Sequence, residues 1–278
     1  MVRFQRTLAV PVWVEGFGYW SDRDIRVVFQ PAEENTGVVF VRDDLPGKPR
    51  IPVSPERCVE IPHRTALAVG SAHVEMVEHA LAALMGMAVD NCEIHVDAAE
   101  MPGLDGSALA FAQAFVRAGF VEQGSRIRPL AIATPFRLGE GDDRWMTAAP
   151  GTGALELSFT LRYVEPPSIG CQSAAFVLSP ERFLREIAPC RTFVTLREAE
   201  QIQASGLAKR ATYRDILVFA DDGPMENTLR FPNECARHKI LDLLGDLALV
   251  GRPVVGRIHG YCSGHDWNVR LVRHLLRE

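Results

Sequence analysis

Apolar and polar residues alternate in short runs along the opening part of the chain. Residues 25–30 and 37–41 are β-rich runs typical of strands, and a turn-forming cluster at residues 31–36 separates them. Another short apolar run, residues 8–14, contains Pro11 and has no small-residue cleavage site after it, so we interpret it as a strand and not as a signal peptide. This part of the chain is therefore predicted to form β-sheet.

The period changes to that of a helix at about residue 72. Apolar side chains recur at helical spacing over residues 72–87, and a glycine ends the pattern. A strand is expected at residues 92–96, followed by a second helix at 108–118 that Gly119 ends. The first part of the chain thus combines strands with two helices.

The second part of the chain repeats this plan. A polar stretch at residues 122–129 indicates a boundary between two units. Further elements are expected after it: strands up to about residue 177, helices at 180–187 and 196–205, a strand at 216–220, a long helix at 233–250 and a last helix at 269–276. We therefore predict an α+β fold of two similar domains, residues 1–125 and 126–278, each a β-sheet layered with α-helices.

Two of the predicted helices resemble each other in detail. Residues 78–86 and 237–245 each contain a histidine, a glycine seven positions later and apolar residues between them, and each segment leads into a β-rich run. An internal duplication would explain this match and would let the two helices face each other. Because the match is short, duplication and coincidence carry equal weight at this point.

Composition and charge exclude several classes of function. The 278 residues are 47% hydrophobic and 23% charged, as in an ordinary globular protein, and the formal net charge is −5 without a basic block, which argues against nucleic-acid binding. Six cysteines without a Cys-x-x-Cys pair indicate reduced thiols and a cytoplasmic location. No run of about 18 apolar residues predicts a transmembrane helix. We expect a monomer that acts on a small molecule.

A candidate metal site lies on the long helix of the second part. His238 and Asp242 are four residues apart, so they project from one helix face, and both are good zinc ligands. Catalytic zinc sites usually have three protein ligands and a water, and His79 is the natural third ligand if the two similar helices pack face to face. The alternative is an ordinary surface pair, which this spacing more often indicates.

A carboxylate adjoins the first predicted ligand. Glu78 precedes His79 directly, where it would reach a metal-bound water and accept its proton. The alternative is a surface charge with no catalytic role.

Three more residues could complete the chemistry. His265, in a glycine-marked turn, could donate a proton to a leaving amine, and Asp246, one turn beyond Asp242, could hold that histidine in its protonated form. Lys239 could bind an oxyanion or a substrate phosphate. A turn histidine and a solvated lysine are the alternatives for these positions.

Several segments together resemble one family, the UDP-3-O-acyl-N-acetylglucosamine deacetylases (LpxC). They follow the family's order along the chain: residues 77–86 with Asp90 and Asn91, 101–107, 191–193, 237–247, and 263–265 with Asn268. The resemblance implies two α+β domains with the active site between them. It also implies hydrolysis of the N-acetyl amide of a UDP-linked 3-O-acylated glucosamine, with release of acetate, in lipid A synthesis.

The resemblance assigns a role to each matched residue. His79, His238 and Asp242 would bind one zinc ion, or ferrous iron in the cell. The remaining five residues would act on the substrate and its proton transfers: Glu78 as general base, His265 as general acid or electrostatic stabiliser, Asp246 in orienting it, Thr192 in stabilising the oxyanion and Lys239 in contacting substrate.

Three departures from the family pattern concern the substrate. Trp20 replaces a histidine, Glu165 lies in a replaced Phe-x-His-Pro segment, and Arg210-Ala211-Thr212 replaces Gly-Gly-Ser beside the acyl-chain passage. Arg210 and the preceding lysine would be unfavourable to bury against an apolar passage. Two alternatives therefore stay open: a zinc deacetylase acting on a different acylated amino sugar, and a silent binding protein, which the complete set of site residues argues against.

Overall fold

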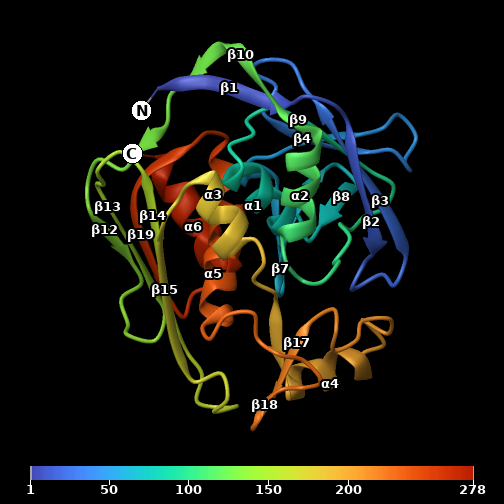
Figure 1. The fold of residues 1–278 in the computed structure, drawn as a ribbon, viewed down its shortest axis with the longest axis vertical. Helices are drawn as coiled ribbons and strands as arrows, with labels where there is room; N and C mark the ends of the chain where they lie inside the picture. The colour runs from blue at the N-terminus through green and yellow to red at the C-terminus, as the bar shows by residue number, and fades with distance from the viewer. Residues whose placement is uncertain (1, 278) are drawn as a thin grey trace.

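The computed structural model describes residues 2–277 and has helices packed between two main sheets (Figure 1). The first sheet has the strand order β2-β3-β9-β4-β5 and the second the order β12-β13-β19-β14-β15, with β11 added to β19. The bounds of the first sheet are β2 (Val12–Phe17), β3 (Asp24–Pro31), β4 (Val38–Arg42), β5 (Arg50–Pro52) and β9 (Cys92–Val96). Those of the second are β11 (Leu130–Ala131), β12 (Phe136–Leu138), β13 (Trp145–Ala149), β14 (Leu155–Arg162), β15 (Cys171–Val177) and β19 (Val254–Tyr261).

The two main sheets have the same connectivity. In each, the central strand (β9 or β19) is parallel to one neighbour (β4 or β14) and antiparallel to the other (β3 or β13), and both outer pairs are antiparallel. A helix precedes the central strand and another follows it, as the repeated sequence plan predicts. These are α1 (Glu78–Gly86) and α2 (Leu109–Ala118) in the first half, and α5 (Glu234–Leu247) and α6 (His265–Leu275) in the second.

Each half carries an insertion at the same place, between its edge strand β5 or β15 and its first main helix, α1 or α5. In the first half this is a small antiparallel sheet of β6 (Cys58–Ile61), β7 (Arg64–Val69) and β8 (Ala72–Glu75). In the second half it contains α3 (Pro180–Arg182), which continues as a π-helical turn (Phe183–Ile187), and α4 (Leu196–Ala204). It also contains the three-stranded sheet of β16 (Phe193–Thr195), β17 (Leu217–Ala220) and β18 (Gly223–Pro224).

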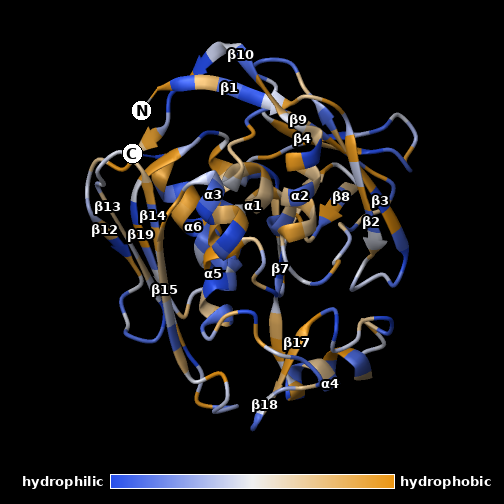
Figure 2. Ribbon diagram, viewed as in Figure 1, coloured by the Kyte–Doolittle hydropathy of each residue, from blue (hydrophilic) through white to orange (hydrophobic). Residues whose placement is uncertain are grey.

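Helix α1 packs against α5 in the centre of the molecule, and this contact joins the two halves. Almost every residue of α1 is buried, because apolar side chains surround it on all sides. Helix α4 differs, since none of its residues is buried. Figure 2 shows hydrophobic colour along β17 and a mixture of both colours on α4. The core is therefore central, and the insertion around α4 projects from it (Figure 1).

Two predictions from the hydrophobic pattern are wrong in part. The helix expected from residue 72 begins at Glu78, because residues 72–75 pair with β7 as strand β8 and Met76 takes a left-handed conformation (φ 57°). Residues 8–14 are not one strand. They divide between β1 (Arg3–Leu8) and β2, with Pro11, which has no backbone N–H, in the break.

Most other predicted elements are confirmed with small shifts. The long helix is α5 with a 3₁₀ turn (Ala248–Val250) after it, whereas the last helix begins at His265 instead of residue 269. Strand β10 (Phe120–Ile127) runs through the polar stretch where we placed the boundary and pairs with β1. The division at residue 125 stays a prediction. The six cysteines are free thiols, and the described residues contain no helix long and apolar enough to cross a membrane.

Candidate metal centre and active site

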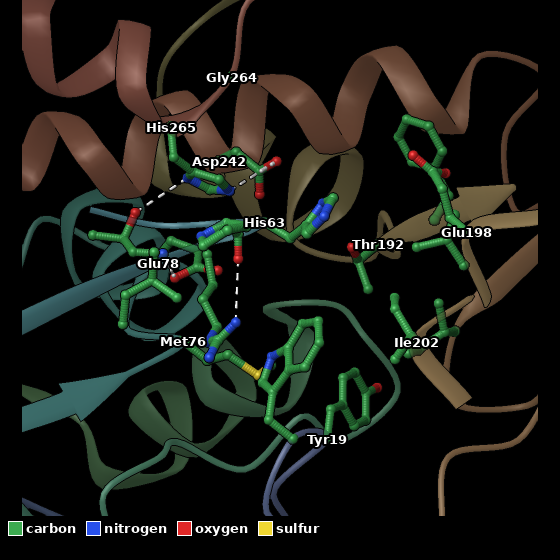
Figure 3. A pocket seen from close by; sticks show the side chains of 18 of the residues that line it. Tyr19, His63, Met76, Glu78, Thr192, Glu198, Ile202, Asp242, Gly264 and His265 are labelled. Carbon is green, nitrogen blue, oxygen red and sulfur yellow. Dashed lines mark hydrogen bonds and ion pairs between the residues drawn. The ribbon is translucent and has the colours of Figure 1, made fainter. Parts of the chain in front are cut away.

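A cavity of about 1160 Å³ brings the predicted site residues of both halves together. Figure 3 shows Glu78, Asp242 and His265 gathered on one side, Thr192 further along, and Glu198 and Ile202 of α4 on the opposite side. The cavity therefore has a polar end at the junction of the two halves and an end formed by the second insertion. All eight predicted residues lie at or beside the polar end: Glu78, His79, Thr192, Lys239, Asp242 and His265 line it, His238 contacts Asp242 and Asp246 contacts His265.

Helix geometry sets the positions of the charged side chains. Because α1 begins at Glu78, the base and ligand candidates occupy its first turn. On α5, His238, Asp242 and Asp246 follow each other at intervals of four residues, and all three are at most 3% exposed. The strip that they form faces the site and not solvent, so the surface-pair alternative is wrong.

Gly245 permits the close approach of the two helices. A Cβ atom there would overlap the backbone carbonyl oxygen of Glu78, so any other residue would push α1 away from α5. Gly86, the matching glycine of α1, leaves room for the ring of Phe183 instead. The shared glycine of the two helices thus reflects close packing at both positions.

The three predicted ligands place their donor atoms around one point. Single ligand atoms of His79, His238 and Asp242 all lie within 4.8 Å of one another. Asp242 Oδ1 is 3.2 Å from His238 Nε2 and 3.8 Å from His79 Nε2. Zinc bonds of about 2.0–2.2 Å in a tetrahedral arrangement put neighbouring ligand atoms at about this separation. The donor set fits a zinc ion.

The hydrogen bonds and pKa values of the ligand candidates also favour binding of a metal cation. Nδ1 of His238 donates to the carbonyl oxygen of Cys190 (3.0 Å), which leaves Nε2 free to bind a metal. Burial and the neighbouring His238 ring lower the pKa of His79 to about 3, so its imidazole is neutral. Burial alone would raise the pKa of Asp242, but His238 and Lys239 hold it well below the usual value. The site therefore offers the neutral imidazole of His79, Nε2 of His238 and the carboxylate of Asp242.

The Arg191–Glu234 ion pair fixes the backbone beside His238. Both side chains are buried, with Nε of Arg191 2.8 Å from Glu234 Oε1. The residues on either side of Arg191 are Cys190, whose carbonyl orients His238, and Thr192, which lines the cavity. This pair was not predicted, because a buried ion pair formed by residues 43 positions apart has no local sequence signal.

The acid and base candidates have opposite pKa shifts. Burial raises the pKa of Glu78 to about 7, and the nearby carboxylates of Asp246 and Asp242 add to the shift. Burial would lower the pKa of His265, but Asp246, whose Oδ2 is 2.8 Å from Nδ1, outweighs it, and the pKa rises to about 9. Near neutral pH such a pair contains a carboxylate able to accept a proton and an imidazolium able to donate one.

Two residues that were not predicted as catalytic complete the surroundings of Asp246. Asn268 Nδ2 donates to Asp246 Oδ2 (2.8 Å), and the hydroxyl of Thr65 donates to Oδ1 (2.5 Å). Asn268 lies in a segment that resembles the family, whereas Thr65 is a lone threonine in a β-rich run. A threonine in such a run is ordinary, so its position near the site had no signal in the sequence.

Lys239 forms an ion pair with the ligand candidate Asp242, and its contact with substrate stays a prediction. Its Nζ lies 2.7 Å from Asp242 Oδ2, the carboxylate oxygen not shared with the two histidines, and the side chain lines the cavity. Asp242 raises the pKa of Lys239 against the opposing effect of burial, so the lysine is cationic. A positive charge therefore faces the cavity beside the ligand atoms.

Arg210 does not lie in the wall of the cavity, so the unfavourable burial of a cation there does not arise. Its side chain is about half exposed (45%), with Nη1 2.8 Å from both the Asp22 carbonyl oxygen and Asp24 Oδ1. Its guanidinium lies 4.6 Å from the ring of Phe17. Since the side chain turns outward to the first half, Ala211 and Thr212 form the cavity wall at this point.

The other two positions that depart from the family pattern, Glu165 and Trp20, differ in their relation to the cavity. Glu165 is exposed and lies outside the cavity lining. Trp20 lines the cavity, and its indole lies 4.3 Å from the guanidinium of Arg64, which is paired with Glu75. Trp20 therefore changes the cavity wall beside Arg64, and Tyr163 of the segment around Glu165 lines the cavity as well.

Comparisons with known proteins identify the family of this chain. The family model for UDP-3-O-acyl N-acetylglycosamine deacetylase (LpxC) matches residues 5–277. The UDP-3-O-acyl-N-acetylglucosamine deacetylase of Chlamydia felis is 39% identical over 277 residues, 99% of this chain and 98% of that protein. Those of Anaeromyxobacter sp. and Phenylobacterium zucineum are also 39% identical, over 99% and 98% of this chain and 89% and 93% of theirs. The chain belongs to the LpxC family of zinc-dependent deacetylases.

Proposed function

We propose that this protein hydrolyses the N-acetyl amide of a UDP-3-O-acyl-N-acetylglucosamine, with release of acetate and a free amine, in lipid A synthesis. One observation carries the proposal: a metal-ligand triad, a carboxylate with raised pKa and a carboxylate-paired histidine meet at one cavity. A binding protein without activity would not need this combination.

His79 Nε2, His238 Nε2 and Asp242 Oδ1 would hold the metal ion. We propose zinc, with ferrous iron as the cellular alternative for the same donors. When bound, the ion would polarise the amide carbonyl and lower the pKa of a water molecule towards neutrality. His238 would be kept in the metal-binding tautomer by its hydrogen bond to Cys190.

The protein side chains would move the protons. Glu78, buried beside the ligands, would accept the proton of the attacking water. His265, held as a cation by Asp246, would donate a proton to the leaving nitrogen. Thr192 and Lys239, which line the cavity near the ligands, would stabilise the negative charge that develops on the carbonyl oxygen.

The rest of the cavity suits an acylated nucleotide sugar. Leu196, Ala199 and Ile202 of α4 line it, and Val218 of β17 lies in the same wall. These apolar side chains would bind an acyl chain, because Leu196, Ala199 and Ile202 are only half-buried and face the cavity. At the other end the cavity is lined by cationic residues suited to a diphosphate: Arg64, Arg144, Lys239 and Arg273.

Trp20 supports a second candidate, a zinc deacetylase that acts on a different acylated amino sugar. Its ring, packed on Arg64, occupies part of the cavity wall where the family pattern has histidine. The chemistry would be the same, and the difference would concern the sugar or its substituents.

We also propose that the chain folds as two similar α+β domains, near residues 1–125 and 126–278, with the active site between them. The matching connectivity of the two main sheets supports this division. The equivalent positions of His79 and His238 on α1 and α5 support it as well.

Acetate release from three compounds would test the function: UDP-3-O-acyl-N-acetylglucosamine, the same compound without its acyl chain, and the acylated sugar without UDP. We expect the complete substrate to be hydrolysed fastest, and Glu78→Ala to abolish turnover while zinc stays bound. Faster hydrolysis of either shortened compound would favour the second candidate. Absence of acetate from all three compounds would contradict both candidates.

A further inference from the structure

Thr65, at the start of β7, is a buried side chain to which the proposed reaction gives no role. It is 3% exposed and belongs to the insertion of the first half, β6-β7-β8. The two residues that its hydroxyl contacts, the proposed acid His265 and its partner Asp246, belong to the second half. Thr65 therefore links an element of one half to the chemistry of the other.

Three hydrogen-bonding contacts define its environment. The backbone N–H of Thr65 donates to Glu78 Oε2 (3.0 Å), and its hydroxyl donates to Asp246 Oδ1 (2.5 Å). The hydroxyl oxygen also lies 3.1 Å from His265 Nδ1. One residue thus contacts the proposed base, the proposed acid and the carboxylate between them.

The direction of these bonds follows from the groups involved. A carboxylate can only accept, so the Thr65 hydroxyl proton points to Asp246 Oδ1, and the hydroxyl oxygen lies beside the Nδ1–H that His265 donates to Asp246 Oδ2. Oδ2 of Asp246 already accepts from His265 and Asn268. Because Asp246 is fully buried, loss of the hydroxyl would leave Oδ1 without this donor and free the carboxylate to rotate.

We infer that Thr65 is a positioning residue, which holds the Asp246–His265 couple at a fixed place relative to Glu78. The inference rests on the proposed deacetylase function and deepens it. Thr65 lies at the edge of the cavity, but its hydroxyl is directed at Asp246, so loss of the hydroxyl would affect turnover far more than substrate binding.

Three substitutions distinguish the contribution of the Thr65 hydroxyl from that of its methyl group. Thr65→Val keeps the shape and removes the hydroxyl, Thr65→Ser keeps the hydroxyl and removes the methyl, and Thr65→Ala removes both. All three keep the backbone N–H that Glu78 accepts. If the hydroxyl positions Asp246, Val and Ala should lower kcat about 10- to 100-fold at nearly unchanged KM and zinc content, whereas Ser stays within about threefold of the parent.

A second comparison tests the route through Asp246. In an Asp246→Asn background, Thr65→Val should lower kcat by much less than it does in the parent, because residues that act as a unit are not additive. Should the Val variant not fold, the Ala and Ser variants give the same contrast.

The results distinguish failure of this inference from failure of the function. Two results with an active parent enzyme would overturn the inference alone: a Thr65→Val variant with the kcat of the parent, or a Thr65→Ser variant as slow as Thr65→Ala. Packing of the methyl group would then explain the presence of threonine at this position. A parent without deacetylase activity would overturn the proposed function and the inference together.

Discussion

At the scale of single residues, Glu78 and His265 show how burial and one neighbour produce opposite shifts. Both side chains are removed from water, which disfavours the charged form of each. For Glu78 this effect dominates, and its pKa rises to about 7. For His265 the Asp246 carboxylate reverses it, and the pKa rises to about 9. A proton donor and a proton acceptor are thereby present in the same pH range.

These shifts predict a bell-shaped pH profile of kcat/KM. Activity should fall on the acid side as Glu78 becomes protonated, because a carboxylic acid cannot accept the proton of water. It should fall on the alkaline side as His265 loses its proton. The positive charge of a bound metal ion lowers both values, so the limbs should lie at or below about 7 and about 9.

His265→Gln tests the alkaline limb of this profile. The variant should be slow and should lose its decline at high pH, while its zinc content is kept and its acid limb moves to higher pH, because the His265 cation lowers the pKa of Glu78. An unchanged alkaline limb in the variant would assign that ionisation to another group.

The sequence predicted the site residues that repeat at helical spacing, but not those brought in by distant strands. His238 and Asp242 could be found because ligands four residues apart share a helix face. Thr65 could not, since its contact with Asp246 spans 181 positions and depends on how β7 lies against α5. The outward turn of Arg210 was missed for the same reason, because its partners Asp22 and Asp24 lie in the other half.

At the scale of elements, the junction of α1 and α5 determines whether base and ligands meet. Replacing Gly245 by alanine would place a methyl group against the Glu78 backbone. We expect a loss of about 1–3 kcal/mol in the free energy of unfolding, together with weaker zinc binding and slower turnover, because the helices must separate.

Gly141→Ala is the matched control, since a Cβ atom there meets nothing within 4 Å. Denaturant unfolding and zinc content of the two variants would check the prediction. Equal stability and equal zinc content for Gly245→Ala and Gly141→Ala would show that close approach of the helices is not required.

The second insertion is held against the first half by Arg210 and its neighbours. Ion pairs this exposed contribute little, but the guanidinium also donates to the Asp22 carbonyl oxygen and lies over the ring of Phe17, in addition to its pair with Asp24. The bond from the Arg210 backbone N–H to the Asp22 carboxylate does not depend on the side chain. Arg210→Ala should therefore loosen the wall formed by Ala211 and Thr212 and raise KM for an acylated substrate roughly two- to fivefold, equivalent to about 1 kcal/mol or less.

Kinetics with and without the acyl chain would test this role. The variant should hydrolyse a substrate that lacks the chain as the parent does. Arg214→Ala, at an exposed position in the same insertion, should leave the KM unchanged for the substrate with the acyl chain and for the one without it. A comparable loss with both substrates would mean that Arg210 supports the whole site and not the passage.

The ends of helices and strands could be predicted where the hydrophobic period of the sequence agrees with the strand pairing of the structure. Residues 72–75 carry apolar side chains that fit a helix, yet strand pairing with β7 decides their structure, as their alternating burial shows. Pro11 and the left-handed Met76 mark the breaks that periodicity alone overlooked.

At the scale of the whole molecule, one arrangement is used twice. Both halves place a helix before the central strand of a sheet and an insertion before that helix. The repeated histidine and glycine of residues 78–86 and 237–245 indicated this relation. The order of strands in the sheets had no sequence signal, because strand neighbours are set by packing. The first insertion contributes Thr65 to the site and the second one contributes a wall of the cavity.

The central claim is that both halves together form one metal site. Zinc content per chain, measured after dialysis for the parent and for His79→Ala, His238→Ala and Asp242→Ala, tests it most directly. We predict about one zinc ion in the parent and in the control His73→Ala, whose side chain is 46% exposed, and a large loss in each of the three variants. Retention of a full equivalent of zinc by either the His79 or the His238 variant would contradict the claim.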